Sequence, residues 1–391
     1  MTHRLIVQKY GGSSVADVAS LHHVADRVVE RKKQGYDVVV VVSAMGNSTD
    51  DLLTLAQEVC PTPPRRELDM LLTAGERISM SLLSMAIQDR GFDAISFTGS
   101  QSGILTNDRH VDARIIEVRP IRIQDELERG RIVIVAGFQG MSYKREVTTL
   151  GRGGSDTTAI ALAAALDAEA CEIYSDVDGV YNADPRAVPE ASRLNVVDFE
   201  TMLEMARFGA KVLHAEAVEF ARERGIALLA RATRGGAGQT LVRKDLPPTT
   251  TTPISAIACL QPLHWLTSAP GLDTQPLLDS VLKAGLSPLF CTQLNNTLCL
   301  ALNEDDQPDV HEWLQTSQKG WSIQEVAAVS VIGHEITADP QRLLQMRSIM
   351  TSTVKEHNPL AFLQSSMRCT WIVPVKVAVE VQRALAEVLE L

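Results

Sequence analysis

Residues 149–186 contain a glycine-rich turn that carries one fixed cation, Arg152, and one carboxylate, Asp156. The turn reads GRGGSD, and the Ala- and Leu-rich run 157–166 that follows it contains no Gly or Pro. Because that run predicts a buried helix, the turn would present free backbone N–H groups at a helix N-terminus, where anions bind. A strand expected at 171–174 leads into a polar loop. The segment therefore predicts a site for an anionic ligand on an α/β scaffold.

A second glycine motif lies near the N-terminus. A short apolar strand expected at 5–7 runs into KYGGSS at 9–14, and apolar residues three and four apart predict a helix from Val18. Glycines let the backbone approach phosphate oxygens, and the lysine supplies a compact positive charge. The Walker A pattern G-x-x-x-x-G-K-[ST] occurs nowhere in the chain. The motif predicts a phosphate-binding loop, with an ordinary structural turn as the alternative.

Six short motifs in series resemble the signature of the aspartate kinases. They are KYGGSS at 9–14, VSAMG at 42–46, GER at 75–77, GFQG at 137–140, GRGGSD at 151–156 and FGAKV at 208–212. The resemblance covers about residues 4–245 and is much weaker beyond. It implies a kinase that uses ATP and Mg²⁺ to phosphorylate the β-carboxylate of L-aspartate. The product, 4-phospho-L-aspartate, would serve lysine, threonine and methionine synthesis or a specialised branch of it.

Phosphoryl transfer to a carboxylate brings two anions together, so its catalysis is mainly charge neutralisation and alignment. We expect Lys9 to bridge the β- and γ-phosphates, and the amides of Gly11, Gly12 and Ser13 to support those oxygens. Asp156 would hold Lys9 in place or organise the metal side. It is not needed as a base, because the substrate carboxylate is already ionised at neutral pH. No direct metal ligand is assigned.

Two opposite charges are expected to hold the poles of an amino acid. Arg152 has the planar fork that clamps a carboxylate, and the resemblance places Glu76 against the substrate's amino group. From the residues alone, a solvated ion pair of Glu76 with Arg77 would be the usual explanation, and the resemblance reverses that preference. The resemblance adds to the aspartate site Ser43, Thr49, Phe138, Gly153, Gly154 and Ser155.

The resemblance places the nucleotide against the loop that begins at residue 175. It implies contacts of Ser175 and Asp176 near the ribose and base, and of Tyr181 beside the adenine. Phosphate contacts are implied for Arg186 and Lys211. Tyr10 and Asp184 complete the nucleotide set.

Three positions depart from the family pattern. Ser175 stands where threonine is common, Asn182 also replaces a more usual threonine, and Ala215 follows His214 where proline is typical. None of these changes removes a charge that the chemistry needs. For residues 184–186 the alternative is a plain turn with a surface ion pair.

Length and composition predict two domains in a folded, globular chain. The 391 residues are many for one core, and the net charge of −11 argues against nucleic acid or an anionic membrane as the main partner. The six cysteines are scattered without a C-x-x-C pair, which favours free thiols in a cytoplasmic protein. We expect no signal peptide and no membrane span, because no apolar run approaches the roughly 20 residues that a bilayer requires.

The expected architecture is a three-layer α/β/α amino-acid-kinase domain at 1–246, a linker at 247–253 and a paired ACT-like α+β regulatory domain at 254–391. In the first domain we expect strands at 37–42, 94–97, 132–136 and 226–230, an edge strand at 239–242, and an exposed hairpin or flap at 141–146. Expected helices there span 68–90, 198–207 and 211–223. In the second domain the expected strands are 264–267, 287–292, 297–302, 322–326, 328–333, 361–365 and 367–373, with helices at 275–284, 308–317, 339–356 and 375–391.

The C-terminal domain is expected to pair two chains into a homodimer through sheet edges. Lysine or threonine is a possible effector there. However, the turn at 268–274 departs from the family's effector-loop pattern, so we expect a weak response. A fully working sensor with an unfamiliar sequence is the alternative.

Two other function classes compete with an aspartate kinase. One is a kinase of the same fold that acts on glutamate, acetylglutamate, carbamate or a nucleotide. The other is a catalytically silent amino-acid-binding regulator. The presence of Lys9, Glu76, Arg152 and Asp156 together disfavours the silent regulator. ADP release that depends on added aspartate would distinguish an aspartate kinase from both alternatives.

Overall fold

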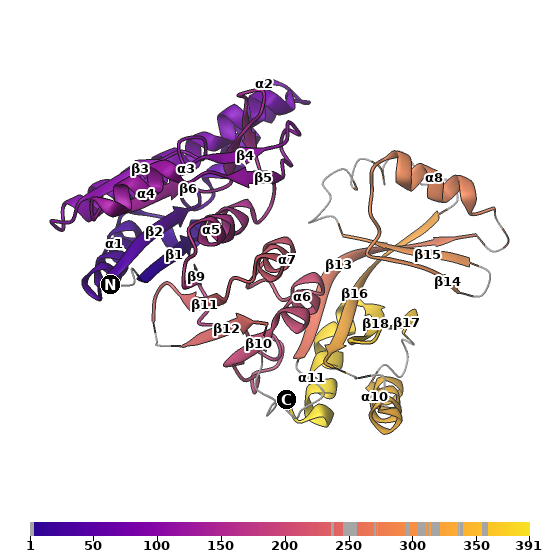
Figure 1. The fold of residues 1–391 in the computed structure, drawn as a ribbon. Coiled ribbons are helices and arrows are strands. Elements are labelled where there is room, and N and C mark those ends of the chain that lie inside the picture. Colours follow the sequence, from indigo (N-terminus) through magenta and orange to yellow (C-terminus); the bar gives the residue numbers. More distant parts are fainter. Residues whose placement is uncertain are drawn as a thin grey trace. The chain divides into compact units, whose positions relative to one another are not determined.

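The computed structural model divides the chain into two compact units. Unit 1 comprises residues 1–180, 193–206 and 211–250, and unit 2 comprises 181–192, 207–210 and 251–391 (Figure 1). The structure describes residues 4–235, 238–244, 256–269, 271, 273–294, 297–303, 310, 313, 321–334, 336, 339–353 and 359–391. The linker expected at 247–253 lies outside the described residues.

Unit 1 is built on an eight-stranded sheet in the order β10-β12-β11-β9-β1-β2-β6-β3, in which the β11–β12 pair is antiparallel and every other pair is parallel. Side chains 38–42 of the run DVVVVV are all buried, as expected for a strand covered on both faces. The strands are β1 (Arg4–Tyr10), β2 (Tyr36–Val42), β3 (Ala94–Phe97), β6 (Ile132–Ala136), β9 (Ala170–Ser175), β10 (Val196–Asp198), β11 (Leu228–Ala232) and β12 (Gln239–Arg243).

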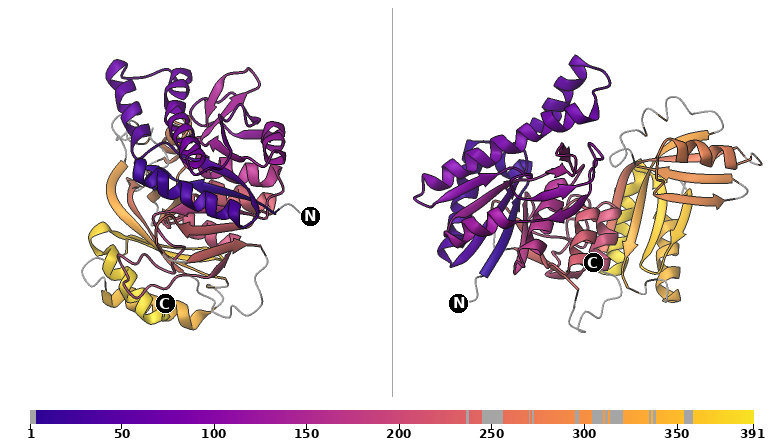
Figure 2. Two further views of the ribbon diagram at one scale, coloured as in Figure 1. Left: turned by 90° about the vertical axis from the view of Figure 1, so that its left-hand side faces the viewer. Right: turned by 45° about the horizontal axis from the view of Figure 1, so that its top comes forward.

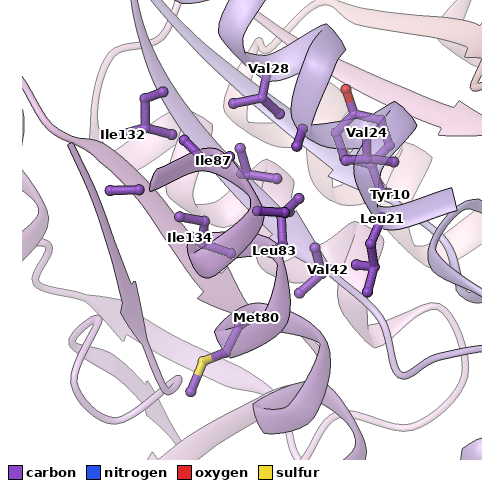
Figure 3. Close-up of a cluster of buried hydrophobic side chains, with 14 of the residues drawn as sticks. Tyr10, Leu21, Val24, Val28, Val42, Met80, Leu83, Ile87, Ile132 and Ile134 are labelled. Carbon is purple, nitrogen blue, oxygen red and sulfur yellow. The ribbon is translucent and has the colours of Figure 1, made fainter. Parts of the chain in front are cut away.

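Helices cover both faces of this sheet, which confirms the predicted three-layer fold. On one face α1 (Val18–Lys33) and α3 (Arg65–Gln88) bury Val24, Leu83 and Ile87 against β2 and β6 (Figure 3). On the other face α5 (Gly154–Ala165) packs against β1, β2 and β9. The remaining helices are α2 (Ser48–Val59), α4 (Ile121–Glu128), α6 (Phe199–Arg207) and α7 (Ala215–Arg224).

A small four-stranded sheet, β5-β4-β7-β8, completes unit 1. Its β7–β8 hairpin confirms the hairpin expected around 141–146, and residues 143–145 at its tip are exposed. The strands themselves are largely buried, so the hairpin is not a free flap. They are β4 (Ile104–Thr106), β5 (Ile115–Val118), β7 (Gln139–Ser142) and β8 (Val147–Thr149).

Helix α3 is long and apolar enough to span a membrane by length and composition alone, but half of its apolar window is buried inside the unit, as in the core helix of a globular domain. Helix α2 runs along α3, buries none of its own residues and stands clear of the sheet (Figure 2).

Unit 2 contains a six-stranded antiparallel sheet in the order β14-β15-β13-β16-β18-β17. The two long central strands, β13 and β16, pair along their length and pass through both halves of the unit. Each half has its own apolar core. This layout confirms the predicted paired α+β fold. The elements are β13 (Ala256–Ser268), α8 (Gln275–Lys283), β14 (Phe290–Leu294), β15 (Thr297–Leu302), β16 (Trp321–Ile332), α10 (Pro340–Thr353), β17 (Ala361–Gln364), β18 (Arg368–Pro374) and α11 (Ala378–Leu389).

Four expectations about elements were wrong or fall outside the described residues. The strands expected at 322–326 and 328–333 are the single strand β16, because both halves of unit 2 share it. The strand at 239–242 is not an edge, because β10 pairs outside it. The helix expected from 211 begins at Ala215, after a turn. Most of the helix expected at 308–317 lies outside the described residues.

Two segments that interrupt unit 1 in sequence pack into unit 2. The amide of Ile257 donates to the carbonyl of Asn182 at 2.7 Å, and Arg383 Nε donates to the carbonyl of Ala187 at 2.7 Å. A Cβ on Gly209 would lie 2.1 Å from the carbonyl oxygen of Cys259. Segments 181–192 and 207–210 therefore belong to the core of unit 2.

Candidate active site

The glycine and serine motifs of unit 1 meet at one edge of its sheet, where the parallel strands end. Ser43 N donates to Tyr10 O at 3.0 Å, and Gly137 N donates to Val42 O at 3.0 Å. Gly11 N donates to Tyr174 O at 3.4 Å. The loops after β1, β2, β6 and β9 are thus adjacent, although their motifs are scattered over more than 160 residues. The carboxyl edge of a parallel sheet is where α/β folds place their ligands.

Lys9 and Asp156 form a buried ion pair at this edge. The side chain of Lys9 in β1 lies toward α5, since Gln8 and Tyr10 occupy the opposite face. Its Nζ lies 2.7 Å from Asp156 Oδ1 in the first turn of α5, and the two side chains are 12% and 5% exposed. Asp156 Oδ1 has no aligned hydrogen bond among the described residues. The structure therefore brings together the two residues predicted to be catalytic.

The first glycine motif packs backbone against backbone. A Cβ on Gly12 would lie 3.0 Å from the carbonyl oxygens of both Ala44 and Gly46, and Gly46 N donates to Gly12 O at 3.1 Å. Gly11 and Gly12 are half-buried, and Ser13 is exposed in the short 3₁₀ turn η1 (Gly12–Val15). A side chain at position 12 would push the loop after β2 away from the loop after β1.

The second glycine motif turns tightly into α5. Gly151 and Gly153 have φ of 75° and 69°, which glycine adopts without strain. A Cβ on Gly153 would also lie 2.7 Å from His214 Cγ. Helix α5 begins at Gly154 without a side-chain cap. The amides of Gly154 and Asp156 donate to Gly151 O and Gly153 O at 3.1 and 2.9 Å, so of the first three amides only that of Ser155 has no such bond among the described residues and could donate to an anion. Arg152 is exposed and has no ion-pair partner among the described residues.

Glu76 is buried on α3 with half of its carboxylate unsatisfied. The side chain is 3% exposed, Ala44 N donates to Oε1 at 3.2 Å, and Oε2 has no hydrogen-bond partner among the described residues. Burial raises the pKa of Glu76 to about 7. Because Glu76 is buried while Arg77 is exposed, the alternative of a solvated ion pair between them is wrong. A buried carboxylate without a cation is suited to receive one from a ligand.

Phe138 and Ser155 line the same turn. Phe138 has a φ of 65°, its N–H donates to Thr158 Oγ1 at 3.2 Å, and its carbonyl accepts from Leu150 N at 2.9 Å. Ser155 lies against Gly137, where an added Cβ would be 2.6 Å from Ser155 Oγ. Ser43 is half-buried directly after β2, and Thr49 is half-buried in the first turn of α2.

The residues expected to contact nucleotide fall into both units. In unit 1 Ser175 ends β9 and Asp176 follows it, and the carbonyl of Ser175 accepts from Thr233 N at 2.8 Å. Exposed Lys211 is also in unit 1. Tyr181 is half-buried in unit 2, where the Asp184 carboxylate accepts bonds of 3.0 and 2.9 Å from Arg186.

The Asp184–Arg186 pair has the geometry of a surface ion pair in a plain turn, which is the alternative given above for residues 184–186. The side chain of Arg186 is 87% exposed, and the hydrogen bonds that its guanidinium donates hold the pKa of Asp184 below the usual range. The nucleotide role of both residues stays a prediction. No group of three or more His, Cys, Asp or Glu side chains that could hold a metal occurs in the part of the chain that the structure describes.

A buried polar network on the α1 face of β1 and β9 was not predicted. Glu172 is 1% exposed and accepts from Gln8 Nε2 at 2.8 Å and from Tyr174 OH at 3.0 Å. It also pairs with Arg31 and, at 3.0 Å, with Arg231. The one sequence signal was a glutamate inside an apolar strand, and its partners lie up to 164 residues away.

The sequence profile of the amino acid kinase family matches residues 4–229. The aspartokinase of Mycobacterium tuberculosis is 60% identical over 247 residues, which are 62% of this chain and 59% of that protein. Aspartokinase 2 of Bacillus subtilis is 52% identical over 241 residues, with the same two shares. The chain thus matches about 59% of the length of these curated relatives, and the aspartate-kinase resemblance of its motifs is confirmed.

Two solved structures match nearly the whole chain. The aspartate kinase of Synechocystis is 32% identical with a TM-score of 0.57, and the match covers 99% of this chain and 70% of that one. Aspartokinase III of E. coli, determined with aspartate and ADP, has a TM-score of 0.82 over 98% of this chain and 99% of that one. At 24% identity the second likeness supports the fold, including the paired C-terminal unit.

The raised pKa of Glu76 predicts a pH-dependent stability change. A carboxyl group with a raised folded-state pKa stabilises the fold below its unfolded value of about 4.5, and that contribution is lost as pH rises through about 7. Glu76→Gln should therefore gain roughly 2 to 3 kcal/mol of unfolding free energy relative to the unsubstituted protein between pH 5 and pH 8.5. Denaturant unfolding at both pH values checks this. Glu67→Gln, at an exposed glutamate of the same helix, is the control, and a pH-independent difference for Glu76→Gln would contradict the assignment.

Proposed function

Because the chain belongs to the amino acid kinase family, we propose that it transfers the γ-phosphoryl group of ATP to the β-carboxylate of L-aspartate, forming 4-phospho-L-aspartate. The observation that carries the proposal is the half-satisfied carboxylate of Glu76 at the edge where Lys9 and Asp156 pair. Identity of 52–60% to proteins named aspartokinase supports the same substrate.

The Lys9–Asp156 pair would neutralise charge during transfer. An ammonium has three donors, and Asp156 is the one carboxylate partner of Lys9 among the described residues, so donors remain for the β- and γ-phosphate oxygens. The amide of Gly11 donates to Tyr174 O at 3.4 Å, so the amides of Gly12 and Ser13 would support the same oxygens. Asp156 fixes the position of the ammonium. The substrate carboxylate is ionised at neutral pH and attacks without a base.

Glu76 and Arg152 would hold the two α-substituents of aspartate. The ammonium of the substrate supplies the cation that Glu76 lacks, and ionisation of Glu76 then becomes favourable. Arg152 binds the α-carboxylate with two parallel N–H donors. With both poles held, the β-carboxylate faces the nucleotide. Ser43, Thr49, Phe138, Gly153, Gly154 and Ser155 would complete this site.

For the nucleotide we retain the assignments that the family resemblance implies. They are Tyr10, Ser175 and Asp176 with Lys211 on unit 1, and Tyr181, Asp184 and Arg186 on unit 2. Mg²⁺ bound to ATP would neutralise phosphate charge. Mg²⁺ in kinases is held by substrate phosphates, water and one or two carboxylates. The described residues fit such a nucleotide-bound Mg²⁺, because Asp156 supplies a carboxylate beside Lys9.

We further propose a cytoplasmic enzyme of amino-acid biosynthesis, of the lysine and threonine branches or a specialised one, that is active as a homodimer. All six cysteines are free, which suits a reducing compartment. The edge strands β14 and β17 of unit 2 could pair with a second copy. Nucleic acid and membranes are not expected partners, given the net charge of −11.

Trapping of the acyl phosphate tests the reaction. With ATP, Mg²⁺, L-aspartate and hydroxylamine, the protein should form aspartyl β-hydroxamate, because hydroxylamine captures an activated carboxyl group. Omission of aspartate is the control. A hydroxamate from glutamate or another acid, with none from aspartate, would assign the chain to a different kinase. If no acceptor acid stimulated the release of ADP, the protein would be a silent regulator.

Substitution of Lys9 tests its role in transfer. Lys9→Ala should lower kcat about 100-fold or more and change either KM much less, as expected for a contact that matters most in the transition state. Steady-state kinetics for both substrates checks this. Lys33→Ala, at an exposed lysine of α1, should leave kcat unchanged. Near-normal turnover of Lys9→Ala with weakened ATP binding alone would remove Lys9 from catalysis.

The C-terminal unit is proposed to respond only weakly to amino-acid effectors. The E. coli protein has also been determined with lysine and aspartate, but it is 24% identical to this chain. The turn at 268–274 lacks the family's effector-loop pattern, although residues 270 and 272 lie outside the described residues. We expect a dimer by solution mass and less than twofold inhibition, on the order of a few tenths of a kcal/mol, by submillimolar lysine and threonine, alone or together. Strong inhibition would establish a working sensor instead.

A further inference from the structure

Asp69 is a fully buried carboxylate of α3 that the reaction as proposed does not use. Its side chain is 0% exposed. His110 Nδ1 lies 2.5 Å from Oδ2, while Thr149 Oγ1 and Val111 N donate to Oδ1 at 2.6 and 3.0 Å. None of the three donors belongs to α3. A buried carboxylate with three donors from elsewhere in the chain fixes those segments to its own helix.

The three donors lie on two adjoining segments, the end of β8 just before Arg152 and the loop 110–113 that packs against it. Thr149 ends β8, three residues before Arg152, and its carbonyl accepts from Ala113 N at 2.9 Å. Gly151 rests on the same loop, because a Cβ there would lie 3.3 Å from Asp112 Oδ1. Val111 has a φ of 73°, a conformation that a β-branched residue rarely adopts. The bond from its N–H to Asp69 holds the loop in that conformation.

Asp69 and Glu76 lie on one face of α3. They are seven residues apart, which is two helical turns, and both are buried. Glu76 therefore lies on the same face of α3 as Asp69. Arg152 follows Thr149, whose side chain is hydrogen-bonded to Asp69. The two residues proposed to grip the poles of the substrate are connected through this one carboxylate.

We propose that Asp69, with His110 and Thr149 as its donors, is a positioning residue that fixes the separation of Glu76 and Arg152 and thereby selects aspartate over longer acidic amino acids. The inference rests on the function proposed above. Glutamate differs from aspartate by one methylene, and a pocket distinguishes such a pair only if its contacts cannot shift. A loosened connection would let the α-substituents move and admit the longer side chain.

Isosteric substitutions separate this role from a general loss of stability. Thr149→Val removes the donor and keeps the shape, and Thr149→Ser restores the hydroxyl. Asp69→Asn replaces an acceptor oxygen by an amide that meets a donor. His110→Asn keeps an N–H near the position of Nδ1, and His110→Ala does not. Ile87→Val, in the core of the same helix, is the matched control for destabilisation.

We expect the KM for aspartate to rise about tenfold or more in Asp69→Asn and Thr149→Val, with the KM for ATP unchanged. The ratio of kcat/KM for aspartate to that for glutamate should fall, and Thr149→Ser and His110→Asn should stay near the unsubstituted values. An unchanged KM for aspartate, or a change in all constants that parallels Ile87→Val, overturns the proposal.

Amide hydrogen exchange tests the same connection without any activity. In the ligand-free Asp69→Asn protein, amides of residues 149–154 should exchange faster than in the unsubstituted protein and in Ile87→Val. Exchange at the unsubstituted rate overturns the proposal whichever substrate the enzyme takes. Failure of the proposed function would appear separately, as unsubstituted protein that releases no ADP in response to aspartate.

Discussion

The ion pair between Lys9 and Asp156 is the interaction on which the geometry of unit 1 depends. Removing two charges from water costs several kcal/mol per ion, and their attraction offsets this only in good geometry. The two charged atoms lie 2.7 Å apart, because β1 is a central strand and α5 is packed against it, although the contact is not aligned as a hydrogen bond. The close packing of Gly12 and Gly153 then brings the neighbouring loops up to the pair. A fixed ammonium beside a helix N-terminus is the preorganisation that phosphoryl transfer needs.

Much of this site could be predicted from the sequence, because its parts are local. The β-branched run 38–42 specifies a buried strand by itself, and GRGGSD followed by an Ala-rich run specifies a turn into a helix. The order of the motifs then identified the fold. A glycine motif also records a close approach, since only glycine fits where Gly153 meets His214. Such patterns can be recognised in a single sequence because each one consists of neighbouring residues.

What the sequence did not predict depends on contacts between distant residues. Glu172 accepts a hydrogen bond from Gln8 and forms an ion pair with Arg231. The sequence of its own strand does not indicate either partner. The single strand β16 looked like two, because its local pattern does not show that two halves share it. Segment 181–192 lies between elements of unit 1 in sequence and yet packs into unit 2, held by Arg383 from the last helix. Periodicity reports which face of an element is apolar, and it does not report what covers that face.

Asp69 and Glu76 differ in how far their hydrogen bonds are satisfied, and the different roles proposed for them rest on that difference. They lie on the same face of one helix and are equally hidden from water. Asp69 accepts from three donors, whereas Glu76 accepts from one and leaves an oxygen without a partner. Because an unsatisfied buried oxygen destabilises the free protein, its retention needs a compensating gain, and a bound ammonium provides one. Burial alone does not distinguish these two residues. The number of donors that the rest of the chain supplies to each carboxylate does.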